Sequence, residues 1–136
     1  MREILFRGKK YGTDEWCYGS LQCFKGYSIF DTIWKHFIHV DYKTVGQYVG
    51  LKDRKHHRIF EGDIIRFHKF RDEPDWVGLV EYDESCALYI VKGKRPVLYA
   101  ANDPGYFEVQ LSSIDKDTIE IIGNRWDNID ILESLL

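Results

Sequence analysis

Basic side chains are concentrated in one short stretch of the sequence that could bind an anion. Between Lys52 and Arg71 the sequence has seven Lys or Arg residues and three acids, which gives a formal charge of +4 before any histidine is protonated. Lysine and arginine at this density can contact phosphates, and interleaved aromatic rings can stack on bases. The residues expected in a nucleic-acid or partner-binding site are Lys52, Arg54, Lys55, Arg58, Lys69 and Arg71, and the interleaved rings are Tyr48, Phe60, Phe67, Phe70 and Trp76.

The charge of the rest of the chain has the opposite sign. The whole protein carries −3, and residues 101–136 alone carry −6. A dipolar surface of this kind can steer an anionic partner to one side, or hold copies of the chain head to tail. Two solvated loop tips of opposite sign would give the same pattern.

Catalytic chemistry has one possible nucleophile. Cys86 could use His68 as a base and Asp83 to orient it, if the strand over 63–70 neighbours the hairpin over 76–91. Glu61 and Asp63 share a strand face, as general acid and base pairs sometimes do. Asp63 at the start of a strand more often accepts hydrogen bonds from backbone amides, and Cys86 fits a small apolar position, so no catalytic residue is assigned.

Metal and cofactor sites are weakly indicated. His36, His39 and Asp41 could converge on a metal in an extended segment, although 36 and 39 then point to opposite faces. The sequence contains no HExxH, no GxxxxGK[ST] and no GxGxxG. We therefore expect neither a bound metal nor a cofactor.

Composition favours a β-rich cytoplasmic protein. The chain has 136 residues, with 44% hydrophobic, 30% charged and 15% aromatic, which fits one domain with a sheet-rich core. Three cysteines without CxxC spacing are typical of reduced, packed thiols in a cytoplasm. The longest apolar run, from Cys86 to Val91, is far shorter than the roughly twenty residues needed to cross a bilayer.

Short apolar segments separated by turn residues predict strands and one terminal helix. Gly78 marks a bulge or a close backbone approach within its strand. The helix should begin near Asn128, with Ile129, Leu132 and Leu136 on its apolar face. The expected strands span residues 3–7, 15–24, 45–51, 63–70, 76–82, 87–91, 109–111 and 118–122.

Residues 29–38 fit two descriptions. Apolar residues at 30, 33, 34, 37 and 38 have helical spacing, and Ser28 with Asp31 resembles a capping box. The β-branched and aromatic content favours extended structure instead. Because the run is short, we expect it to be extended.

Two blocks in the middle of the chain resemble a known family. The first reads Thr44-Val45-Gly46-Gln47-Tyr48-Val49-Gly50-Leu51-Lys52-Asp53 and the second Phe60-Glu61-Gly62-Asp63-Ile64. With an opening Arg2–Lys9 segment and a closing Ile121–Asn128 segment, they resemble the YopX-type proteins of phages and prophages, a family without an assigned biochemical activity. The loop over 52–58 departs from the family pattern because it is more basic and lacks a glycine.

The combined expectation is an all-β fold. We expect residues 1–136 to form a single domain, with an N-terminal β-meander region (1–60) that packs on a C-terminal SH3-like barrel (61–136) and ends in a short helix. The resemblance implies a phage or prophage accessory protein of the bacterial cytoplasm, acting as a non-enzymatic binding or assembly module. The expected partner is a second copy, with a phage or host protein or nucleic acid also considered and no membrane. The alternatives are a nucleic-acid-binding small barrel and a small enzyme.

Overall fold

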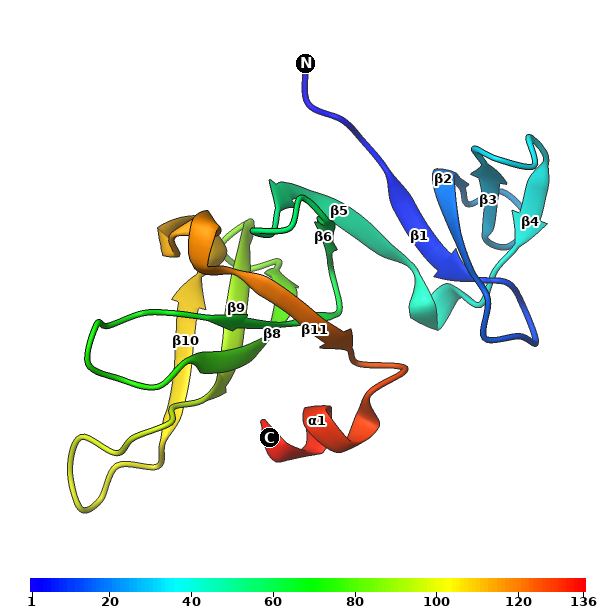
Figure 1. Ribbon diagram of the computed structural model, residues 1–136. Coiled ribbons are helices and arrows are strands. Elements are labelled where there is room, and N and C mark those ends of the chain that lie inside the picture. The colour runs from blue at the N-terminus through cyan, green and yellow to red at the C-terminus, as the bar shows by residue number, and fades with distance from the viewer. The chain divides into compact units, whose positions relative to one another are not determined.

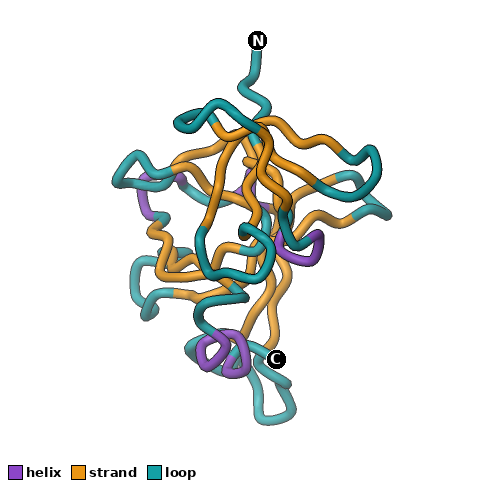
Figure 2. Tube along the Cα trace, turned by 90° about the vertical axis from the view of Figure 1, so that its right-hand side faces the viewer, coloured by secondary structure: helices purple, strands orange, loops and turns teal.

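Antiparallel strands make up most of the chain in the computed structural model, which describes residues 1–136 (Figure 1). Helices are few and short, as the tube coloured by secondary structure makes plain (Figure 2). The all-β class is therefore confirmed. The chain divides into two units, Met1–Gly50 and Leu51–Leu136, with the boundary inside one strand. None of the helices has the length and apolar content that crossing a bilayer requires.

The first unit is an antiparallel meander. Its hydrogen-bonded order is β4-β3-β2-β1-β5, and a bridge between Lys10 and Val40 also joins the end of β4 to the end of β1. Cys17, Ile29 and Val40 are buried together on the inner face. The elements are β1 (Phe6–Lys9), β2 (Trp16–Gln22), β3 (Ser28–Asp31), β4 (Phe37–His39), a short 3-10 turn (Tyr42–Thr44) and β5 (Gly46–Lys52).

The ambiguous segment over 29–38 is extended, as expected, but a tight turn divides it into two strands. The buried Asp31 carboxylate accepts hydrogen bonds from the backbone amides of Ile33 and Trp34, both at 2.8 Å. These bonds end β3 and fix the turn, and Lys35 then adopts a left-handed φ of 55°. The chain returns as β4, with Phe37 opposite Phe30.

The second unit contains a five-stranded antiparallel sheet with the order β10-β9-β8-β7-β11. Strands β10 and β11 lie at the two ends of this order, so the expected SH3-like closure is not confirmed. Strand β6, which the sequence did not reveal, is hydrogen-bonded to β5, whose residues Leu51 and Lys52 belong to this unit. The elements are β6 (Arg58–Phe60), β7 (Asp63–Phe67), β8 (Trp76–Asp83), β9 (Leu88–Lys94), β10 (Tyr106–Gln110), 3-10 turns (Leu111–Ser113, Lys116–Thr118), β11 (Glu120–Asn124) and α1 (Ile129–Ser134).

Aromatic rings fill one side of this sheet. Phe67, Trp76 and Phe107 contact one another, with ring centroids 4.8 to 6.2 Å apart. A Cβ at Gly78 would lie 2.9 Å from the Phe107 ring and 2.6 Å from Val91. Of the two predicted roles of Gly78, the close approach is therefore confirmed, and the bulge occurs in β11 instead.

Helix α1 covers the other side, although not with the predicted face. Leu135, just after the helix, is buried with Ile64 and Leu79, and Ile131 and Leu132 pack against them. Ile129 and Leu136 are 56% and 65% exposed, so two of the three predicted contact residues are wrong. A helix of six residues makes fewer than two turns, and the packing of Leu135 therefore decides which side faces the sheet.

The three cysteines have different environments. Cys17 is buried as expected; its thiol lies 3.2 Å from the carbonyl oxygen of Gly8, and burial raises its pKa. Cys23 and Cys86 are exposed. The expectation that all three pack in the interior is therefore wrong for these two, and Cys86 lies in the β8–β9 turn rather than in the apolar strand.

Candidate functional site

A buried carboxylate organises the basic turn between β5 and β6. Oδ1 of Asp53 accepts hydrogen bonds from the amides of Lys55 and His57, both at 2.9 Å, and Oδ2 accepts one from the amide of Ile121 at 3.2 Å. Burial alone would raise the pKa of Asp53, but the three amides lower it below its ordinary value. The turn is therefore tied to β11, and the side chains of residues 54–57 are exposed to solvent.

Three cations converge on one acid beside this turn. Nζ of Lys55 lies 3.2 Å from Oε1 of Glu120, and Nη2 of Arg66 lies 2.9 Å from Oε2, which Arg54 also contacts. The hydrogen bonds from Arg66 and Lys55 and the charge of Arg54 lower the pKa of Glu120 to about 2. Glu120 is therefore ionised at neutral pH and offsets part of the positive charge.

The structure brings together only two of the six predicted basic residues. Arg54 and Lys55 share Glu120, whereas Lys52 and Arg58 are exposed on the strands that flank the turn. Lys69 and Arg71 lie in the separate β7–β8 turn, where the Lys69 ammonium stands 5.6 Å from the centroid of Trp76. Arg66 and Glu120 were missed, because they lie 54 residues apart and only the pairing of β7 with β11 joins them.

The predicted stacking aromatics are mostly unavailable to a ligand. Tyr48, Phe60, Phe67 and Trp76 are buried, and Phe70 alone of the five is exposed. A surface that binds single strands needs open rings beside its basic groups. The basic turn lacks them, so that part of the prediction is wrong.

His68, the base of the catalytic hypothesis, does not reach Cys86 and Asp83. His68 precedes β8, and its ring nitrogen lies 3.4 Å from Asp75, the residue just before that strand. Asp83 ends the strand, and Cys86 lies in the turn that follows it. Oδ1 of Asp83 accepts hydrogen bonds from the Ser85 hydroxyl at 2.6 Å and the Ser85 amide at 3.0 Å, and these bonds lower its pKa. Asp63, as predicted, accepts a hydrogen bond from a backbone amide, that of Phe60, at 2.8 Å.

The residues of the metal hypothesis have other contacts. The carboxylate of Asp41 accepts a hydrogen bond from the amide of Lys43, His39 stacks near Tyr11, and His36 lies 3.2 Å from the carbonyl of Trp34. Nowhere in the structure do three or more His, Cys, Asp or Glu side chains gather as metal ligands would.

Four exposed apolar side chains of the first unit gather around the β3–β4 turn. Ile33 and Trp34 at the turn are 80% and 72% exposed, and Phe30 and Phe37 on the adjoining strands form an edge-to-face pair with centroids 5.1 Å apart. We call these four residues the aromatic surface. The spacing 30, 33, 34, 37 that mimics a helical face in the sequence is in fact this surface.

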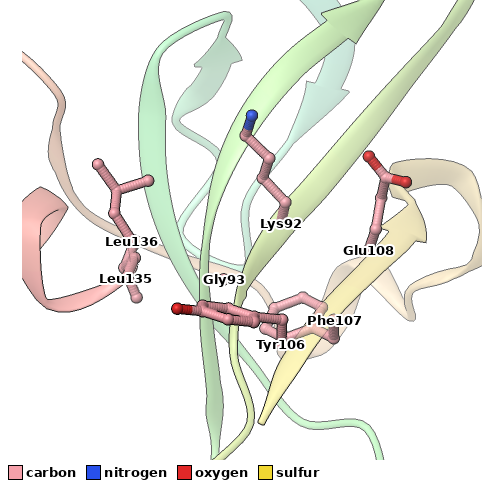
Figure 3. Close-up of a pocket in the computed structure, with 7 residues that line it drawn as sticks. All are labelled: Lys92, Gly93, Tyr106, Phe107, Glu108, Leu135 and Leu136. Carbon is pink, nitrogen blue, oxygen red and sulfur yellow. The ribbon is translucent and has the colours of Figure 1, made fainter. Parts of the chain in front are cut away.

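An apolar groove lies in the second unit, beside the end of α1 (Figure 3). Its volume is about 540 Å³, and its apolar lining consists of Gly93, Tyr106, Phe107, Leu135 and Leu136. Lys92 and Glu108, opposite each other on β9 and β10, supply its polar margin. No local pattern in the sequence indicates this groove, because its walls come from segments that only folding brings together.

Comparison with known proteins gives one informative result. A protein-family model described as YopX protein matches residues 5–133, nearly the whole chain. A search of curated proteins finds no match.

Proposed function

The chain belongs to the YopX family, and from this premise we propose that it is a non-enzymatic assembly module of a phage or prophage, which associates through the aromatic surface of its first unit. The first partner is another copy of the chain. The observation that carries the proposal is the exposure of Ile33 and Trp34 at a turn between two strands.

Large apolar side chains exposed together are characteristic of protein interfaces rather than of free surfaces. Tryptophan and phenylalanine are enriched at such interfaces, where they supply large contact areas and often most of the binding energy. Neither the Ile33 nor the Trp34 side chain has a hydrogen bond or ring contact within its own chain. Their apolar area is therefore available to a partner.

The turn that carries these side chains is already ordered. Besides the two amide bonds to the Asp31 carboxylate, the amide of Lys35 donates to the Asp31 carbonyl at 2.9 Å, and the amide of Asp31 donates to the His36 carbonyl at 3.0 Å. A preorganised turn loses little conformational entropy on binding.

Nucleic-acid binding is less well supported. Glu120 already forms ion pairs with Arg54, Lys55 and Arg66, and four of the five aromatic rings expected to stack on bases are buried. Catalysis is also less well supported, because His68 lies at the opposite end of β8 from Cys86 and Asp83.

The test is the molar mass in solution. Light scattering of the wild type at micromolar concentration should return a mass above that of the 16.1 kDa chain, and the Ile33→Ser/Trp34→Ser variant should return the monomer mass. Leu98→Ser, which removes a 62% exposed apolar side chain from the second unit, is the control and should behave as the wild type. A wild type that is monomeric at every concentration would count against the proposal.

A further inference from the structure

We propose that the apolar groove beside α1 receives the β3–β4 turn of a second copy, so that the chain assembles head to tail. This inference rests on the proposed function, and it names the site on the partner copy to which the aromatic surface binds. The contact is one between copies: the turn belongs to the first unit of one, and the groove to the second unit of the other.

The groove has the size and lining of a site for large apolar side chains. Its volume of about 540 Å³ lies within the range of roughly 300–1,000 Å³ typical of pockets that bury most of a ligand. Figure 3 shows Tyr106 and Leu135 facing each other across it, with Leu136 beside them. Tyr106 and Leu136 are 51% and 65% exposed, and the Lys94 ammonium lies 5.7 Å from the centroid of the Tyr106 ring, so part of their apolar surface is open to solvent in a single chain.

The margin of the groove carries one carboxylate that could pair with a cation of the partner. Nζ of Lys92 lies 2.8 Å from Glu81, which satisfies the ammonium. Glu108, across the strands from Lys92, is exposed and has no ion pair within the chain. A cation that follows apolar side chains would therefore find one unpaired carboxylate at the edge of the groove.

The β3–β4 turn has that arrangement of groups. Ile33 and Trp34 are followed directly by Lys35, an exposed residue with no ion pair in its own chain. When Ile33 and Trp34 enter the groove, Lys35 can pair with Glu108, because their charges are opposite. The apolar contact and the ion pair then form together.

Because the turn and the groove are different surfaces, the contact is heterologous. Each copy offers one turn and one groove, and such contacts form rings when the rotation closes and open filaments when it does not. An interface between two aromatic surfaces would instead be isologous and stop at a dimer. A mixing experiment distinguishes the two.

One chain carries a defective turn (Ile33→Ser/Trp34→Ser) and the other a defective groove (Tyr106→Ser/Glu108→Lys), and circular dichroism and melting establish that both are folded. Each should be monomeric alone by light scattering. Mixed in equal amounts they should form a species of twice the 16.1 kDa chain mass and nothing larger, because one intact turn meets one intact groove. No gain in mass on mixing would overturn the inference.

A charge exchange provides the second measurement. Lys35→Glu and Glu108→Lys should each weaken assembly about tenfold, and the chain that carries both changes should recover near wild-type affinity. Lys43→Glu, at another exposed lysine of the first unit, is the control and should have little effect. If the turn variant is monomeric while the groove and charge variants assemble normally, the proposed function stands and the aromatic surface binds a different partner site.

Discussion

Gly62 shows how one residue can be required for two independent reasons. Its φ is +89°, and a Cβ placed there would lie 2.4 Å from the ring of Trp126. The same residue joins the strands around it, since its amide donates to Val80 at 2.8 Å and its carbonyl accepts from Arg125 at 2.9 Å. A side chain would therefore strain the backbone and displace the C-terminal segment together.

Gly62→Val should lower the melting temperature by many degrees or yield insoluble protein. The left-handed backbone alone costs a β-branched residue roughly 1–3 kcal/mol, and the clash with Trp126 adds to it. Gly50→Val is the matched control, because Gly50 has a φ of +91° with nothing within 4 Å of an added Cβ. Equal losses of melting temperature in the two variants would show that the Trp126 ring moves aside at little cost in free energy.

Asp53 makes stability dependent on acid pH. A carboxylate with a lowered pKa contributes stability that is complete above its ordinary pKa, near 4, and is lost as the pH falls through the folded value. Melting temperature should therefore drop below about pH 4. In Asp53→Asn part of this drop should be absent, and the variant should already be about 1–3 kcal/mol less stable at pH 7, because the carboxamide has a single acceptor oxygen and leaves at least one of the three backbone amides without its acceptor. Parallel pH profiles of the two proteins would contradict this role.

Arg95 anchors the loop that precedes strand β10. Nη1 of Arg95 donates to the carbonyl of Tyr106 at 2.6 Å, its guanidinium lies 4.7 Å from the centroid of Tyr99, and it pairs with Asp103. The amides of Tyr99 and Gly105 hold the Asp103 carboxylate, at 2.9 and 2.8 Å, and lower its pKa. One side chain thus anchors the loop over 96–105 to the end of β10.

Arg95→Met keeps an unbranched apolar side chain and removes the contacts of the guanidinium with Tyr106, Tyr99 and Asp103. The loop should then be cleaved faster by protease, because Asp103 and the Tyr106 carbonyl lose their partner, while the melting temperature falls only slightly. Arg71→Met, in the exposed β7–β8 turn, is the control. Unchanged cleavage in Arg95→Met would mean that the loop is ordered without Arg95.

The elements were predictable where a local pattern decides them. Turn residues and β-branched runs were sufficient for β2, β5, β7 and β8, whose centres lie within the predicted spans. Strand β6 was missed because three residues carry no periodicity, and the contact face of α1 because it depends on the packing of Leu135. The basic turn was predicted, but its acidic partner Glu120 and the groove depend on strand pairing, which no local pattern encodes.

At the scale of the whole molecule, charge and apolar area have separate roles. The basic excess over 52–71 is partly neutralised within the chain by Glu120, and the acidic excess over 101–136 includes the unpaired Glu108. If Lys35 and Glu108 meet between copies, assembly should weaken with added salt but not vanish, since the contact of Ile33 and Trp34 with the groove is insensitive to screening.

The distribution of thiols offers a direct view of the two units. Cys23 is exposed in the first and Cys86 in the second, while Cys17 is buried and its raised pKa slows its reaction. Maleimide reagents should therefore modify the unaltered chain at one position in each unit. Spin labels attached there would measure the separation of the units in solution by electron paramagnetic resonance, and the same spectra would report whether assembly changes that separation.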